Sequence, residues 1–164
     1  MIRAINTFFF IGTLRPAPGT WGSAAAIAAG LILYRLGGAP LLAMATAAVT
    51  ALGFWSVAQG TRGMADPDAS EIVIDEAAGQ WLALCFPAFG FWSRGLPLDN
   101  FPWPGWVAAF LLFRLFDIWK PWVIGRADRR GDAPGVMLDD LWAGLFAGIG
   151  TLILAGLYHG VMMR

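Results

Sequence analysis

The 164-residue sequence is poor in histidine, cysteine and charge, with one histidine, one cysteine and 13% charged residues. The single cysteine, Cys85, excludes an internal disulfide, and its place in an apolar run indicates a packed thiol. Because 11 basic residues balance 11 acidic ones, the net charge is zero, which argues against nucleic acid as a partner. The short N-terminal run FFFI is too little for the core of a signal peptide.

Hydrophobic residues are abundant, at 58% of the chain, which is well above the content of soluble domains and indicates a membrane protein. We predict an all-α integral membrane bundle of about five membrane-associated helices, 21–36, 40–60, 71–92, 104–120 and 139–162. Three of these are marginal in length or charge and require tilt, snorkelling or contact with protein. With no linker or low-complexity tract in the sequence, we expect residues 1–164 to form one membrane-embedded domain.

The positive charges predict an orientation. If all five segments cross the membrane and the N-terminus is cytoplasmic, eight basic residues face the cytoplasm: Arg3, Arg15, Arg62, Arg114, Lys120, Arg126, Arg129 and Arg130. Only Arg35, Arg94 and Arg164 face outward, as the positive-inside rule requires. The acidic residues divide in the same way, with Asp99 alone outside. For Asp66, Asp68, Asp128 and Asp132, an ordinary charged loop is the preferred explanation of this position.

A first acidic cluster opens the third segment. A helix over 71–92 would set Glu71 and Asp75 one turn apart, with Glu76 beside them and Gly79 continuing the face inward. Small residues let helix backbones approach closely in lipid, where packing drives association. This acidic helix start could therefore meet a second one.

The second acidic pair, Asp139 and Asp140, is followed one turn later by Ala143 and Gly144, and Gly148 extends the same small-residue stripe. If the two helix starts meet, their carboxylates repel in a low dielectric unless they are protonated or share a cation. A cluster of oxygen ligands with no histidine or cysteine nearby favours Mg²⁺ over Ca²⁺ or Mn²⁺. The alternative is that each pair only stabilises its own helix dipole.

The segment FRLFDIWKPW carries cations to the same side. Arg114, Asp117 and Lys120 recur every three residues, which places them on neighbouring positions of one helical face, and Pro121 is expected to end the helix at Lys120. Positive side chains would then lie beside the acidic pairs. The alternative is an Arg114–Asp117–Lys120 ladder of ion pairs at the membrane interface.

The segment PAPGTWGS is expected to begin a helix. Pro16 and Pro18 stiffen the approach, Gly19 frees the backbone, and Thr20 or Ser23 can cap the helix that follows. The amide donors and positive dipole of such a helix start attract an anion. An ordinary helix start is the alternative.

The lack of suitable cysteine and histidine residues also excludes several mechanisms of phosphate hydrolysis. The sequence has no Cys-x5-Arg arrangement, which excludes a cysteine phosphatase. His159 lies near the C-terminus on the predicted outer side, which excludes a histidine-based phosphatase. The run DPDAS at 66–70 follows a polar turn rather than a buried strand, so it does not match the loop of aspartyl phosphatases. Metal-activated water with a carboxylate base remains.

Four segments, in order and at similar spacing, resemble the bacterial phosphatidylglycerophosphatase A family: PGTWGS (18–23), EIVIDEAAGQW (71–81), FRLFDIWKPW (113–122) and GVMLDDLWAG (135–144). The resemblance covers nearly the whole chain. It implies a Mg²⁺-dependent enzyme of the bacterial cytoplasmic membrane that removes the terminal phosphate of phosphatidylglycerophosphate. One departure is DPDASEIV, two residues longer than the DPSEIV of many relatives, which leaves the role of Asp66 and Asp68 open.

The resemblance, carried over residue by residue, supports a hypothesis for each site residue. Metal ligation is assigned to Asp75, Glu76, Asp139 and Asp140, catalysis to Glu71, Asp75, Glu76 and Asp117, and phosphomonoester binding to Thr20, Ser23, Arg114 and Lys120. The site would face the cytoplasm, where a lipid headgroup can reach it without leaving its leaflet. The expected partner is a membrane phospholipid substrate, with no nucleic acid and no obligate protein partner.

Three alternatives are kept. Another lipid phosphomonoester, such as phosphatidate, is a possible substrate, because no residue of the sequence indicates recognition of the second glycerol of phosphatidylglycerophosphate. A carboxylate-lined cation or proton transporter would need charged residues near the bilayer midplane in several helices. A structural membrane scaffold would use its nine tryptophans as interfacial anchors.

Overall fold

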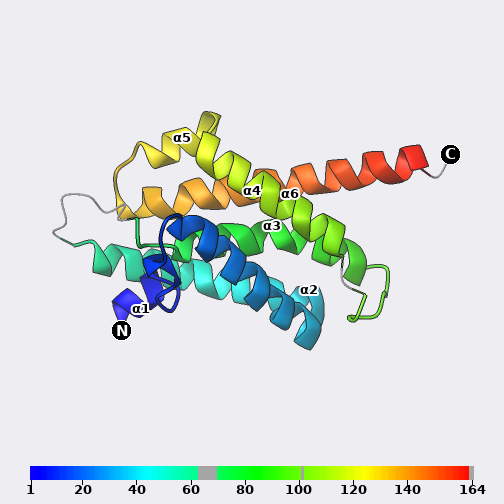
Figure 1. Ribbon diagram of the computed structural model, residues 1–164, viewed down its shortest axis with the longest axis horizontal. Helices are drawn as coiled ribbons and strands as arrows, with labels where there is room; N and C mark the ends of the chain where they lie inside the picture. The colour runs from blue at the N-terminus through cyan, green and yellow to red at the C-terminus, as the bar shows by residue number, and fades with distance from the viewer. Residues whose placement is uncertain (63–69, 101, 163–164) are drawn as a thin grey trace.

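The computed structural model describes residues 1–62, 70–100 and 102–162, and these ranges contain helices and no strand (Figure 1). The helices are α1 (Ile2–Asn6), the short 3-10 helix η1 (Ile11–Thr13), α2 (Pro18–Gly60), α3 (Ile74–Trp92), α4 (Trp103–Trp119), α5 (Trp122–Asp128) and α6 (Ala133–Met162). The all-α prediction is confirmed. The short helices α1 and α5 were not predicted, because neither is long enough to produce an apolar periodicity.

Helix α2 is a hairpin of two helices. Gly37 and Gly38 have non-helical backbones, and Gly38 has a left-handed φ of 67° that favours glycine. Pro40 lies directly after this break, in the first turn of the second half, where its missing amide hydrogen costs nothing. Figure 1 shows the chain turning back here, from the blue half to the cyan half. The two halves correspond to the predicted helices 21–36 and 40–60.

The other predicted helices differ from the structure at their starts. Helix α3 begins at Ile74 rather than at residue 71, and α6 begins at Ala133, six residues before the predicted 139. Helix α4 ends as predicted, because Lys120 has a left-handed backbone and precedes Pro121. Among the described residues, two helical stretches, Pro18–Gly60 and Ala133–Val161, are long and apolar enough to cross a membrane.

Helix α3 contacts α6 through glycine, as the small-residue stripes predict. A Cβ atom added to Gly79 would lie 2.4 Å from the carbonyl oxygen of Asp140, and one added to Gly144 would lie 2.2 Å from the carbonyl oxygen of Gly79. Gly148 continues the contact against the ring of Phe86. The backbones of α3 and α6 therefore touch at the level of the acidic residues, with no space for a side chain.

The opposite side of α3 packs on the first half of α2. The indole Nε1 of Trp81 donates a hydrogen bond of 2.6 Å to the carbonyl oxygen of Ala26, and Gly30 lies against the same indole. The α3 residues Ala77, Ala83 and Leu84 are fully buried. Helix α3 is therefore the central element that sets the positions of α2 and α6.

Candidate active site

A cavity of about 270 Å³ opens where four helix ends meet. Its lining comes from the start of α2, the start of α3, the end of α4 and the start of α6, together with the segment before α3. The charged residues among them are Asp75, Glu76, Arg114, Asp117, Lys120, Asp139 and Asp140. The structure thus brings together seven of the ten residues that the sequence proposes for the site.

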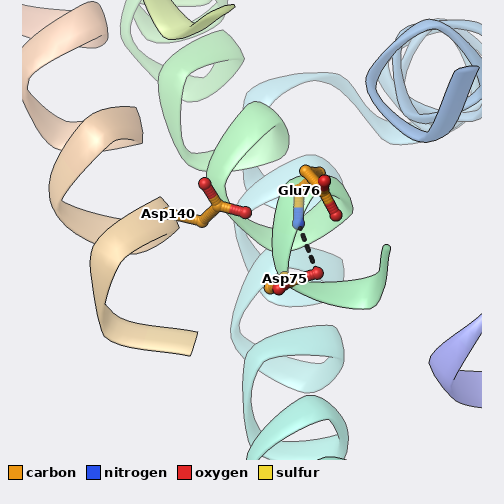
Figure 2. A group of neighbouring side chains, drawn as sticks. All are labelled: Asp75, Glu76 and Asp140. Carbon is orange, nitrogen blue, oxygen red and sulfur yellow. Dashed lines mark hydrogen bonds between the residues drawn. The ribbon is translucent and has the colours of Figure 1, made fainter. Parts of the chain in front are cut away.

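Three carboxylates form the centre of this cavity. Asp75, Glu76 and Asp140 each offer one oxygen, and these atoms all lie within 4.8 Å of one another. Figure 2 shows Asp140 of α6 pointing across to the two acids in the first turn of α3. The Oδ1 of Asp75 accepts a 3.0 Å hydrogen bond from the backbone amide of Glu76, which holds the Asp75 side chain in place.

These three residues fit a hard divalent cation. Asp75 and Asp140 are 6% and 3% exposed, so water cannot screen their mutual repulsion well. The Oε2 of Glu76 and the Oδ1 of Asp140 are buried without a hydrogen-bond partner in the part of the chain that the structure describes. Buried carboxylate oxygens normally have partners, and an all-oxygen set of this kind suits Mg²⁺. The acidic cluster could therefore hold a metal ion.

Asp139 lines the same cavity but does not belong to this group of three. Its Oδ2 accepts a 2.8 Å hydrogen bond from Nζ of Lys120, and Lys120 also bonds Asp128 of α5. Burial of the ammonium lowers the pKa of Lys120, but the two carboxylates more than reverse this effect and raise its pKa above the usual value. Lys120 is thus held as a cation beside the three carboxylates, and the Asp139 prediction as a metal ligand gains no geometric support.

The ladder of ion pairs, kept above as the alternative, is present only in its first half. Arg114 pairs with Asp117 one turn along α4, and both side chains are largely buried. Lys120 does not continue the ladder, because its left-handed backbone at the end of α4 directs it to Asp128 and Asp139 instead. Two cations therefore border the cavity, each joined to its own carboxylate partners.

The start of α2 takes part in the site through residues other than those predicted. The helix begins at Pro18, and its cap Ala17 makes no side-chain hydrogen bond, so capping by Thr20 or Ser23 is wrong. Thr20 is exposed, and the buried Ser23 hydroxyl donates to the carbonyl oxygen of Gly19, one turn back along the helix. Neither Thr20 nor Ser23 lines the cavity, whereas Ala17, Pro18 and Gly19 do.

Gly19 is required by close contact. A Cβ at this position would lie 2.2 Å from Oε1 of Glu76 and 3.1 Å from Nη1 of Arg114. The first turn of α2 therefore covers both the acidic cluster and one of its neighbouring cations. The sequence contained a signal for this contact, the glycine of the PGT run. From the sequence alone, this glycine is explained only by backbone freedom and not by close packing.

Glu71 lies outside the acidic cluster. Because α3 begins at Ile74, Glu71 is not on the helical face of Asp75, and the predicted one-turn spacing is wrong. Its Oε2 accepts a 3.2 Å hydrogen bond from Arg3, and the two side chains are 42% and 71% exposed. Its catalytic role therefore has no support in the geometry. Asp66 and Asp68 lie outside the described residues.

Asp128 contacts a cavity residue, Lys120, and the sequence did not predict this contact. It was interpreted as an ordinary loop charge, but it ends α5 and reaches back to Lys120. Helix α5 has only seven residues, so its apolar repeat is too short to predict a helix from the sequence. The available signal was the strong helix break at Lys120 and Pro121, after which a short returning helix can bring an acid back to the lysine.

The family model for phosphatidylglycerophosphatase A matches residues 4–155 of this chain. The chain belongs to this family. A phosphatidylglycerophosphatase A of Haemophilus influenzae is 35% identical over 147 residues, which cover 89% of this chain and 83% of that protein. The Escherichia coli phosphatidylglycerophosphatase A is 34% identical over 131 residues, 79% of this chain and 69% of its own length.

A third relative carries a different name. A Bacteroides thetaiotaomicron protein, provisionally named as a phosphatidylinositol-3-phosphatase, is 35% identical over 148 residues, 87% of this chain and 86% of that protein. No solved structure matches the chain. Three of the four segments that carry the resemblance to the phosphatidylglycerophosphatase A family supply all the charged residues of the cavity, and the fourth, PGTWGS, supplies Pro18 and Gly19.

Proposed function

We propose that this protein hydrolyses the terminal phosphomonoester of phosphatidylglycerophosphate, releasing phosphatidylglycerol and inorganic phosphate. Membership of the phosphatidylglycerophosphatase A family supports this substrate. One observation carries the chemistry: three clustered carboxylates, Asp75, Glu76 and Asp140, share a cavity with two cations. A phosphomonoester needs both parts, since its charge must be neutralised while water attacks the phosphorus.

Asp75, Glu76 and Asp140 would hold Mg²⁺. When bound, this ion supplies a Lewis acid that polarises phosphoryl oxygens and lowers the pKa of water. Lys120 and Arg114 bind the remaining phosphate oxygens, and the charge on Lys120 is secured by its two acidic neighbours. Phosphate binding requires Arg114 to share its guanidinium between Asp117 and the substrate, which a five-donor group can do.

Asp117 is our candidate for the general base. It lines the cavity, it lies outside the group of three carboxylates, and it is not bonded to Lys120. The water oxygen forms a bond to phosphorus while the bond from phosphorus to the glycerol oxygen breaks. Asp117 accepts one proton from the water and returns it to the departing glycerol oxygen. The other proton stays on the phosphate, so the reaction is balanced.

We also propose that residues 1–164 form one membrane-embedded domain that crosses the bacterial cytoplasmic membrane several times. Support comes from the two long apolar helices, from the hairpin shape of α2, and from the bacterial relatives. The distribution of basic residues favours a cytoplasmic cavity. In this arrangement the cavity lies at the membrane surface, where the headgroup of a lipid substrate resides.

A second lipid phosphate is an alternative substrate. The Bacteroides relative is named for a phosphoinositide, and the residues proposed to bind phosphate make no contact that is specific for glycerol. The transporter alternative has less support, because the acidic groups of the cavity all lie at one end of the helices.

The test is phosphate release by the purified protein in detergent. Phosphatidylglycerophosphate, phosphatidate and phosphatidylinositol 3-phosphate would each be assayed with Mg²⁺ and with EDTA. We expect release from the first lipid, with loss of activity in EDTA and in an Asp75→Asn variant that remains folded. Hydrolysis of only one of the other lipids would reassign the substrate. No hydrolysis of any of them by folded protein would overturn the proposed function.

A further inference from the structure

Gln80 is a buried polar residue for which the proposed reaction has no use. It lies in α3 with no exposed surface, and neither its Nε2 nor its Oε1 has a hydrogen-bond partner among the residues that the structure describes. A buried carboxamide normally satisfies at least one of these atoms, because leaving both unpaired destabilises the folded protein. The unpaired carboxamide therefore points to a hydrogen bond that forms when the neighbouring site is occupied.

Gln80 lies one helical turn after Glu76. Residues four apart on a helix occupy the same face, so their side chains lie one above the other. On one side of this face Gly79 contacts Asp140, and on the other Trp81 contacts Ala26. Gln80 therefore lies on the helix face that carries Glu76, although the two side chains are not bonded to each other in this structure.

The two side chains are chemically complementary. The carboxamide of Gln80 has an amide donor, and the Oε2 of Glu76 is a buried acceptor that likewise has no partner in the described chain. The other oxygen of Glu76 lies against the start of α2, where Gly19 approaches it. The Nη1 of Arg114, the nearest cationic group there, is bonded to Asp117.

We propose that Gln80 is a positioning residue for the metal site: when a divalent cation is bound, the Nε2–H of Gln80 donates to the Glu76 carboxylate and orients it toward the cation. This inference rests on the proposed metal site. A carboxylate that binds a cation through one oxygen is free to rotate unless its orientation is held by a second hydrogen bond. Gln80 supplies this bond from the same helix, so the geometry does not depend on the packing of α4 or α2.

The experiment compares Gln80→Met with the wild-type protein in detergent. Methionine has a similar length and volume but no amide donor. Binding of Mn²⁺, a spectroscopic substitute for Mg²⁺, is measured by electron paramagnetic resonance, and Tm is measured without metal. We expect Gln80→Met to weaken Mn²⁺ binding by about 10- to 100-fold, the usual effect of losing a partner of a metal ligand. The metal-free Tm should stay the same or rise, because an unpaired buried carboxamide has been removed.

Two further variants test the position of the amide and provide a control. Gln80→Asn retains the amide but draws it back by one methylene, and it should weaken Mn²⁺ binding to a similar extent. Thr151→Val removes a buried hydroxyl of α6 that donates to the carbonyl oxygen of Ala147, and it should leave Mn²⁺ affinity unchanged. A purely structural role for Gln80 would instead lower the metal-free Tm and leave Mn²⁺ affinity near that of the wild type.

The possible failures are distinguishable. If the wild-type protein binds Mn²⁺ and Gln80→Met binds it within twofold of the same affinity, the Gln80 inference is wrong and the metal site stands. If the folded wild-type protein binds no Mn²⁺, the metal site and this inference both fail, whatever the hydrolysis assay shows.

Discussion

Replacing Gly79 with alanine would place a Cβ atom 2.4 Å from the carbonyl oxygen of Asp140 and 2.7 Å from the Phe113 ring. A normal contact between carbon and oxygen needs about 3.2–3.4 Å, so α3 and α6 must separate by roughly 1 Å, at a cost of about 1–3 kcal/mol in stability. The three carboxylates span these two helices, with Asp75 and Glu76 on α3 and Asp140 on α6. The substitution therefore widens the site itself.

A displacement of about 1 Å can cost on the order of 100-fold in rate, because a metal site tolerates only about 0.5 Å. We expect Gly79→Ala to lower kcat/KM for lipid phosphate hydrolysis by roughly that factor and to raise the Mg²⁺ concentration that gives half-maximal activity. The assay is phosphate release against Mg²⁺ concentration, with Tm measured on the same samples. Gly156→Ala is the matched control, since a Cβ there meets no atom within 4 Å.

The reasoning would be refuted by a Gly79→Ala protein with a lower Tm but an unchanged Mg²⁺ dependence. That result would mean that the helices separate without moving the acidic residues. Gly144→Ala is a second probe of the same contact, because its Cβ would lie 2.2 Å from the carbonyl oxygen of Gly79. It should therefore reproduce the Gly79→Ala phenotype from the other helix.

Three further predictions use the same hydrolysis assay. Lys120→Met should lower kcat/KM by about 100- to 1,000-fold, the usual effect of losing one group that stabilises transition-state charge. Activity near that of the wild type would contradict the proposed role of Lys120 in phosphate binding. Asp128→Asn removes one of the two carboxylates that bond Lys120 in the described chain and should raise KM several-fold; an unchanged KM would show that Asp128 does not position the lysine. Glu71→Gln should keep wild-type kcat and change the free energy of unfolding by less than about 0.5 kcal/mol, because the ion pair with Arg3 is exposed. A Glu71→Gln protein that is folded but inactive would restore the original catalytic assignment.

The general features of the site follow from local patterns that the sequence carries. The run IDEAAGQW places acids in a first helical turn and glycine one turn later, and LDDLWAG repeats that order in another helix. Two such helices can meet only through their small residues, and the Gly79–Gly144 contact confirms this prediction. The break at Lys120 was equally predictable, because the proline that follows it disfavours helical geometry.

Helix starts were predicted less well, and this had consequences for individual residues. A shift of three residues at the start of α3 removes Glu71 from the face of Asp75. A start at Pro18 places Thr20 and Ser23 within α2 and leaves Gly19 against the acidic cluster. Boundary errors of this size are usual, but each residue turns a helix by about 100°, so a small error changes which side chain faces the site.

The sequence by itself determined the class of the protein, the acidic helix starts and the glycines that let them meet, because these depend on composition and on spacing along one helix. Only the tertiary structure decided which neighbours each of two adjacent acids contacts. Asp140 joins Asp75 and Glu76, whereas its neighbour Asp139 faces Lys120. This division depends on the rotation of α6 about its axis, and the rotation is set by packing against α3. Nothing in the run LDDL distinguishes the two, since they differ only in which neighbour the folded chain brings to each.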